Sequence, residues 1–126
     1  MNQSTMVLFD KTALPSSLGT SENDVLIQFY DMFIQITLES WSDLSNINKS
    51  NDLKLVRQTA HKLKSSSASV GALALADSLK QLELATADGN LLRVIEQTEK
   101  TTQLLHATID LVRAELARLQ KDPARA

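Results

Sequence analysis

Residues 60–72, AHKLKSSSASVGA, and the short run before them decide the fold of this chain. Apolar or small side chains recur here at alternating intervals of three and four, the spacing of one buried stripe on an amphipathic helix. This stripe consists of Leu53, Val56, Ala60, Leu63, Ser67 and Val70. The spacing predicts a helix that starts after a cap at residues 50–52 and continues to about Val70. Gly71 either ends this helix or marks a close approach of another segment.

A neighbouring face of the same helix is polar and basic. His61 lies on it, off the apolar stripe, with Lys64 one turn further along and small side chains after that. Residues 53–76 contain no Asp or Glu but four lysine or arginine residues. An imidazole held out on a rigid helix, beside a cation and with little bulk around it, suits a covalent carrier of phosphate.

The segment of residues 21–45 is expected to form the first long helix. Residues 21–24, SEND, resemble a capping box, with an acidic residue three positions after the capping serine. Trp41 lies near the helix end, where it either packs in the core or anchors a partner, because tryptophan is enriched at interface hot spots. A wide apolar face is expected, with one row formed by Val25, Phe29, Met32 and Ile36 and with Leu26, Phe33 and Leu44 beside it.

Two further helices complete the pattern. Leucines line one face of residues 72–87, and residues 88–90, DGN, form a strong turn signal in which Asn90 can cap the next helix. Residues 91–119 keep an unbroken alternation of spacings of four and three, which predicts a helix about 43 Å long. Four amphipathic helices joined by short turns predict an all-α protein, with an antiparallel up-down four-helix bundle at residues 21–119.

The two ends of the chain are expected to be less regular. Residues 1–20 form an arm in which Asp10 caps a short helical turn before a proline and a glycine interrupt it. This arm either docks on the bundle or stays a flexible leader. Residues 120–126 are expected to be a frayed tail, and residues 1–126 together a single domain.

Composition excludes several classes of function. The chain has 126 residues, 43% of them hydrophobic and 22% charged, and a formal net charge of −2, so the whole molecule is not a basic nucleic-acid binder. It has no cysteine, hence no disulfide and no thiolate chemistry. No apolar run approaches the roughly 18–20 residues that span a bilayer, and the start lacks the pattern of a secretory signal. We therefore expect a cytoplasmic protein without membrane insertion.

The sequence shows no cofactor site. It has no glycine-rich phosphate loop and no nucleotide-binding motif. Its two histidines, His61 and His106, are 45 positions apart and lack the spacing of metal ligands. His106 lies beside the predicted stripe of the last helix, and we interpret it as a surface or boundary residue. We expect no cofactor and no metal of the chain's own.

The central helix and the segment after it also carry a family resemblance. The residues concerned are His61, Leu63, Lys64, Ser65, Gly71 and the leucine-rich run of residues 75–83. Their arrangement resembles the signature of histidine phosphotransfer (HPt) domains. One position departs from it: the family usually has glycine where this chain has Ser65, and serine is small enough to leave the imidazole accessible. The resemblance covers about residues 10–119 and implies a four-helix bundle with a short N-terminal covering helix.

The resemblance implies a function for the chain. An HPt protein accepts a phosphoryl group from an aspartyl phosphate on one receiver domain and passes it to the aspartate of another. His61 would be the carrier, at Nε2, and Lys64 would stabilise the charge of the phosphate. The receiver would supply Mg²⁺ and most catalytic groups, so the chain would be a monomeric phosphocarrier and not an enzyme with its own ATP site.

A docking surface and an orienting group are also implied. Glu83 lies on the helix after the central one, and antiparallel packing would bring it near His61, where its carboxylate or a bonded water would orient the imidazole. The residues expected to dock a receiver domain are Arg57, Lys62, Ser65, Ala68 and Gly71.

Two other interpretations stay open at this point. A single histidine on an exposed helix face is usually a solvated surface residue, and a basic face need only aid solubility. The chain would then be a non-catalytic helical adaptor that binds a partner without phosphotransfer, and covalent labelling of His61 separates this interpretation from the first. The period of residues 91–119 also allows dimerisation through the last helix, which sedimentation would detect.

Overall fold

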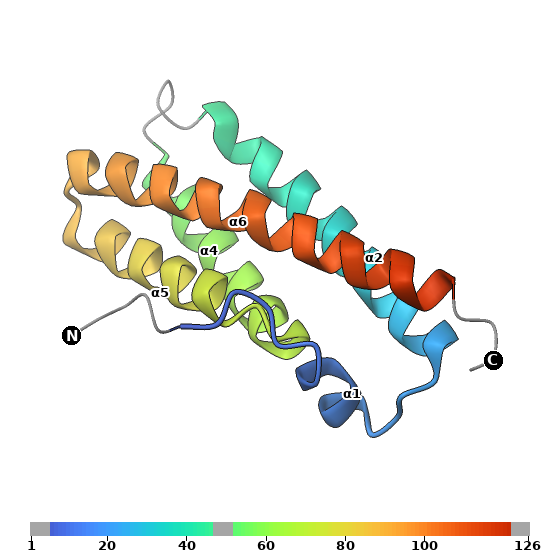
Figure 1. Cartoon of the computed structure of the whole chain (residues 1–126). Helices are drawn as coiled ribbons and strands as arrows, with labels where there is room; N and C mark the ends of the chain where they lie inside the picture. Colours follow the sequence, from blue (N-terminus) through green and yellow to red (C-terminus); the bar gives the residue numbers. More distant parts are fainter. Residues whose placement is uncertain (1–5, 47–51, 122–126) are drawn as a thin grey trace.

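The computed structural model of the chain describes residues 6–46 and 52–121. Its elements, in chain order, are α1 (Ala13–Leu18), α2 (Asn23–Ser42), the 3₁₀ turn η2 (Asp43–Asn46), α4 (Leu53–Val70), α5 (Leu73–Asp88) and α6 (Leu91–Gln120) (Figure 1). The described part consists of helices without any strand, so the all-α prediction is confirmed. The start of the expected arm, most of the polar turn before α4 and most of the expected tail lie outside the described residues.

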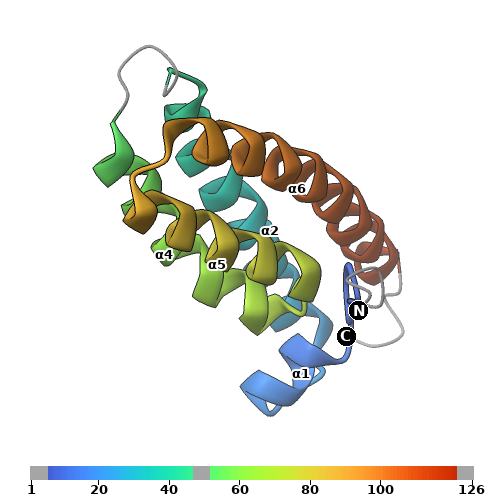
Figure 2. The ribbon, with the colours of Figure 1, turned by 90° about the vertical axis from the view of Figure 1, so that its left-hand side faces the viewer.

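The four long helices pack side by side, each against two of the others (Figures 1 and 2). α4 packs on α5, α5 on α6, α6 on α2, and α2 on α4. At the start of α2, the Asn23 side chain donates to the Leu119 carbonyl, near the end of α6. Near the end of α2, Trp41 instead bonds Thr102, well back along α6. The two helices therefore run in opposite directions.

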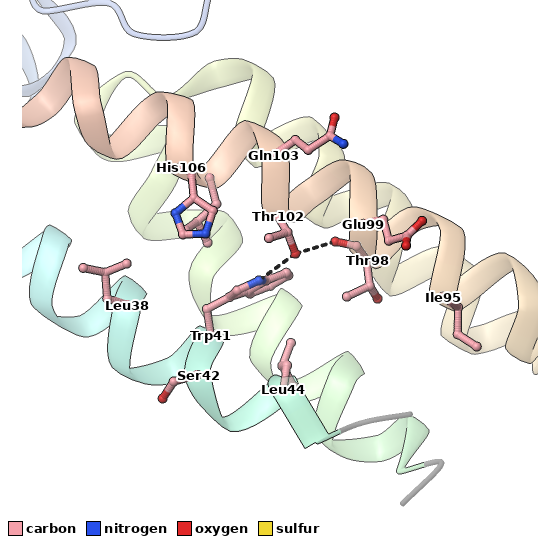
Figure 3. Close-up of a pocket in the computed structure, with 11 residues that line it drawn as sticks. Leu38, Trp41, Ser42, Leu44, Ile95, Thr98, Glu99, Thr102, Gln103 and His106 are labelled. Carbon is pink, nitrogen blue, oxygen red and sulfur yellow. Dashed lines mark hydrogen bonds between the residues drawn. The ribbon is translucent and has the colours of Figure 1, made fainter. Parts of the chain in front are cut away.

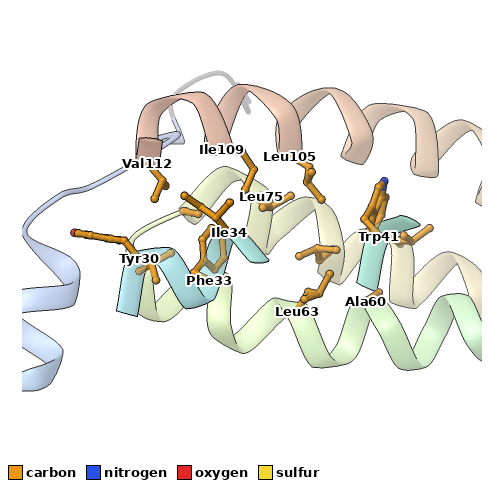
Figure 4. Packing of buried hydrophobic residues seen from close by; sticks show 14 of the residues in the cluster. Tyr30, Phe33, Ile34, Trp41, Ala60, Leu63, Leu75, Leu105, Ile109 and Val112 are labelled. Atoms are coloured by element: carbon orange, nitrogen blue, oxygen red, sulfur yellow. The ribbon is translucent and has the colours of Figure 1, made fainter. Parts of the chain in front are cut away.

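The core fills the space between the four long helices. Figure 4 shows side chains from all of them turned toward one another, among them Phe33 of α2, Leu63 of α4, Leu75 of α5 and Ile109 of α6. Fully burying a side chain of this size stabilises the fold by about 1.5–3 kcal/mol. Because Ala60 and Leu63 are both fully buried, α4 has one fixed rotation about its own axis. That rotation decides which of its side chains face solvent.

The N-terminal arm is tied to the turn between α4 and α5. The Asp10 N–H donates to the Gly71 carbonyl at 2.8 Å, and the Ala74 N–H donates to the Val7 carbonyl at 2.9 Å. Gly71 has a left-handed backbone conformation with φ of 91°. A Cβ at this position would collide with the Asp10 carbonyl oxygen. Gly71 therefore ends α4, and the backbone of Asp10 packs closely against it. From Val7 onward the arm is docked on the bundle instead of being a flexible leader.

Two of the predicted helix caps are confirmed, and one is wrong. The side chains of Asp52 and Asn90 each accept a backbone N–H from the first turn of α4 and α6, at 3.0 and 3.2 Å. At α2, however, Glu22 and not Ser21 precedes the first helical residue, and the Glu22 side chain makes no capping bond. Asn23 is buried there against α6, so a tertiary contact overrides the local capping pattern.

The two ends of the α1–α2 region differ in detail from the prediction. The Asp10 carboxylate accepts bonds from the N–H and the hydroxyl of Thr12, directly ahead of α1, but Thr12 itself holds the cap position without a side-chain bond. α2 ends at Ser42 and continues as the 3₁₀ turn η2, whereas one helix to about Ser45 was predicted.

The predicted apolar face of α2 is partly wrong. Phe29, Met32 and Ile36 keep 40, 45 and 38% of their surface exposed. α2 carries two overlapping apolar rows, and spacing alone does not decide which of them turns inward. The row that faces the core is Leu26, Tyr30, Phe33, Ile34, Thr37 and Trp41.

The long last helix has the predicted extent but a different contact row in its first half. α6 has 30 residues. Val94 and Thr101 are fully buried there, while Leu91 of the predicted stripe is 37% exposed. The hydroxyls of Thr101 and Ser78 lie 2.6 Å apart, so a buried polar contact joins this half of α6 to α5.

Candidate functional site

The rotation of α4 places His61 on the surface. Its neighbour Ala60 is fully buried, whereas the His61 side chain keeps 70% of its surface exposed. The imidazole nevertheless has a fixed partner, because its Nδ1 lies 2.8 Å from Oε2 of Glu83 on α5. The antiparallel turn between α4 and α5 therefore brings together two residues that are 22 positions apart in the chain.

Lys64 shares the same carboxylate. Its Nζ donates to Oε1 of Glu83 at 2.9 Å, so one oxygen of Glu83 holds the imidazole and the other holds the ammonium group. The side chains of Lys64 and Glu83 are 32 and 23% exposed. His61, Lys64 and Glu83 form a compact triad, and we use this name for them below.

The triad fixes charge and hydrogen-bond direction. The hydrogen bond from Lys64, together with the one from His61, holds the pKa of Glu83 below its usual value, so Glu83 is an anion at neutral pH. A carboxylate only accepts hydrogen bonds, so Nδ1 of the neutral imidazole carries the proton. Nε2, on the edge of the ring away from Nδ1, then keeps a free lone pair and can act as a nucleophile.

The predicted docking residues lie in three places, which are the exposed face of α4, the contact with α2 and the buried turn after α4. Arg57, Ser65 and Ala68 are exposed on α4, on the same side as His61. Lys62 is exposed too, but its Nζ donates to the Ser40 hydroxyl of α2 at 3.0 Å and so reaches away from the triad.

Gly71 does not lie on the predicted docking surface. It is buried beneath the N-terminal arm, where the Asp10 N–H bonds its carbonyl. A partner cannot reach it while the arm is docked, and its role is to shape the turn between α4 and α5.

An apolar groove next to α4 was missed by the sequence reasoning. It has a volume of about 290 Å³ and lies between α1, α2 and α4. Phe29, Met32 and Ile36 of α2 form one wall, and Ser66 and Ser69 of α4 form another. The signal was present as the second apolar row of α2, which was assigned to the core instead.

A second groove lies between α2 and α6, and Trp41 is one of the residues that line it (Figure 3). Its volume is about 690 Å³. Trp41 lies within it with only 8% of its surface exposed, and its Nε1 donates to the Thr102 hydroxyl at 2.9 Å. Trp41 is thus a packing residue. His106 also lines this groove and is exposed, as predicted, and no residue of the triad lines it.

The described residues carry neither a metal-binding cluster nor a membrane-spanning helix. Within residues 6–46 and 52–121, no cluster of three or more His, Cys, Asp or Glu side chains is placed to hold a metal ion. None of the helices in the same residues has the length and hydropathy to cross a membrane.

Comparison with known proteins places this chain in a family. The sequence matches the Hpt domain over residues 28–122, which is most of the chain, so the chain belongs to the Hpt domain family. Among solved structures it is similar to histidine-containing phosphotransfer protein B (HptB) from Pseudomonas aeruginosa PAO1, with a TM-score of 0.78 and 26% sequence identity. The match covers 88% of this chain and 96% of HptB. No curated protein matches the chain.

Family membership gives the class of function. Proteins of this class are phosphocarriers of phosphorelays and not kinases, and the family's partners are receiver domains. The chain is accordingly a histidine phosphotransfer protein.

Proposed function

We propose that His61 carries the phosphoryl group, at Nε2, between the aspartates of two receiver domains. The observation that carries this proposal is the hydrogen bond between His61 Nδ1 and Glu83, because it leaves the lone pair of Nε2 free on a ring that is 70% exposed. His106 lines the α2–α6 groove instead, apart from the basic face of α4.

The transfer step is a displacement at phosphorus. The Nε2 lone pair forms the N–P bond while the bond from phosphorus to the aspartyl oxygen breaks, and that electron pair leaves with the receiver's carboxylate. The ring keeps its proton on Nδ1 and gains one positive charge, which the Glu83 carboxylate opposite Nδ1 stabilises. Donation to the second receiver is the reverse of this step.

Lys64 is proposed to stabilise the transferred group. It lies one turn beyond His61 and carries a compact charge on a flexible stem, so its ammonium can reach a phosphoryl group on Nε2. The receiver supplies Mg²⁺ and most of the catalytic groups, and the chain uses no cofactor and no ATP of its own.

The receiver is proposed to dock over two adjoining surfaces. The first is the exposed face of α4 that bears Arg57, Ser65 and Ala68, and it is basic enough to attract an acidic receiver pocket. The second is the apolar wall formed by Phe29, Met32 and Ile36 of α2. Exposed apolar side chains beside a polar face are typical of protein–protein contact sites. We expect the protein to act as a cytoplasmic monomer.

A transfer assay tests this proposal. The protein is incubated with a phosphorylated receiver domain and Mg²⁺, and acid-labile, base-stable label is followed on wild type, His61→Gln and His106→Gln. We expect label on wild type and on the His106 variant, and none on the His61 variant. Absence of label on wild type across several receivers would favour a non-catalytic adaptor, and label on His61→Gln would mean that another residue is the carrier.

A further inference from the structure

The carboxylate of Glu83 has two partners, and phosphorylation of His61 would affect the two contacts differently. His61 Nδ1 lies 2.8 Å from Oε2, and Lys64 Nζ lies 2.9 Å from Oε1. A phosphoryl group on Nε2 would sit on the opposite edge of the ring from Glu83. It would therefore leave the Nδ1 contact in place but attract the ammonium of Lys64.

Charge decides how Lys64 responds. A phosphoryl group carries about 1.5 to 2 negative charges near neutral pH and three strong acceptor oxygens, whereas Glu83 carries one charge. The Lys64 side chain has a flexible four-carbon stem and is partly exposed, so its ammonium group can move from one acceptor to the other without disturbing the core. The Oε2 atom of Glu83 stays bonded to Nδ1 of His61. Because this bond holds the carboxylate in place, Glu83 cannot follow the ammonium group to the phosphoryl oxygens.

We propose that Lys64 changes partners during each transfer cycle. In the unphosphorylated protein it is paired with Oε1 of Glu83, and on phosphorylation it moves to the phosphoryl oxygens on His61. It returns to Glu83 when the group leaves. No covalent bond to Glu83 forms, and the Nδ1 proton stays between His61 and Oε2 throughout, so the displacement at phosphorus balances as written above.

This exchange gives Glu83 a second task, which rests on the function proposed for His61. Glu83 is a positioning residue that competes with the phosphoryl group for Lys64. The competition weakens the hold of Lys64 on the phosphoryl group by the strength of the Lys64–Glu83 ion pair. It therefore limits the stability of the phosphohistidine, so that the phosphoryl group can pass on to the next receiver domain.

A double-mutant cycle tests the exchange. The equilibrium between phosphorylated receiver and phosphorylated protein is measured for wild type, Lys64→Met, Glu83→Gln and the double variant. Glutamine keeps an acceptor for the Nδ1 proton but cannot form the ion pair. Lys62→Met is the matched control, because Lys62 bonds Ser40 and not Glu83.

The exchange predicts that removing Lys64 costs more when residue 83 is glutamine. The loss of phosphorylated protein caused by Lys64→Met should be about threefold to fivefold larger in the Glu83→Gln background than in wild type, the factor expected for one partly exposed ion pair. Lys62→Met should show the same effect in both backgrounds. A Lys64 effect that is equal in the two backgrounds would overturn the exchange.

A spectroscopic readout separates the exchange from a purely structural role of Glu83. The ammonium resonance of ¹⁵N-labelled Lys64 should shift between the resting and the phosphorylated protein in wild type, while the Nδ1–H signal of His61 persists. An unchanged Lys64 resonance would contradict the exchange even if transfer proceeds. Failure of wild type to accept any phosphoryl group would instead overturn the proposed function, and the exchange with it.

Discussion

Substituting Gly71 by alanine should detach the N-terminal arm from the bundle. Gly71 has φ of 91°, a left-handed conformation that costs a non-glycine residue about 1–2 kcal/mol. The new Cβ would also collide with the Asp10 carbonyl oxygen, which belongs to the backbone and cannot rotate away. Moving the arm breaks the bond from the Asp10 N–H to the Gly71 carbonyl, with a net cost of about 0.5–1.5 kcal/mol. The total loss in free energy of unfolding is then about 1.5–3.5 kcal/mol.

A second glycine provides the control for this substitution. Gly89 also has a left-handed conformation, with φ of 69°, but an added Cβ there meets no heavy atom within 4 Å. Gly89→Ala should therefore cost only the conformational term, about 1–2 kcal/mol. Urea unfolding of the two variants gives the comparison, and hydrogen exchange of the Ala74 amide, which bonds Val7 of the arm, should accelerate in Gly71→Ala alone. Equal destabilisation by the two substitutions, with Ala74 still protected in both, would refute this reasoning.

Three further predictions concern the core, the docking surface and the triad. Leu63→Ala should lower the free energy of unfolding by about 2–5 kcal/mol, whereas Leu92→Ala, at a position that is 67% exposed, should change it by less than about 0.5 kcal/mol, both measured by urea unfolding. Met32 is 45% exposed, and a docked receiver would bury this apolar surface, so Met32→Ser should weaken receiver binding about fivefold in a titration. Leu111→Ser on α6, at 41% exposure, should leave binding unchanged. The pKa of Glu83 is lowered in the folded protein, so its stabilising contribution is present above the usual glutamate pKa of about 4.3 and is lost as the pH falls through the lower folded value. The stability gap between wild type and Glu83→Gln should therefore narrow as the pH falls below the usual glutamate pKa, and a gap that stays constant over that fall would show that the charge of Glu83 is not its source.

The buried stripe of α4 was predictable because it depends on a single period. Val56, Ala60 and Leu63 are all fully buried, and that rotation leaves His61 outside, as the spacing predicts. The caps at Asp52 and Asn90 were predictable for a similar reason, since each capping bond is made within one turn of the residue that accepts it.

The features that failed depend on contacts between distant segments. α2 has two apolar rows, and only its packing against α4 and α6 decides that Phe33 turns inward while Met32 stays exposed. The prediction that Gly71 docks a receiver is wrong because the sequence does not show that the arm around Asp10 covers it. The approach of Glu83 to His61 followed from antiparallel packing, but its simultaneous bond to Lys64 requires side-chain positions that periodicity does not contain.

The position of the phosphoryl group on the ring tests the account most directly. Wild-type protein labelled with ¹⁵N in its histidines is phosphorylated by a receiver domain, and the ring nitrogens of His61 are observed by long-range ¹H–¹⁵N correlation. The account predicts that Nε2 shifts and couples to phosphorus while Nδ1 keeps its proton against Glu83. A phosphoryl group on Nδ1, or an unchanged His61 in a protein that carries label, would contradict it.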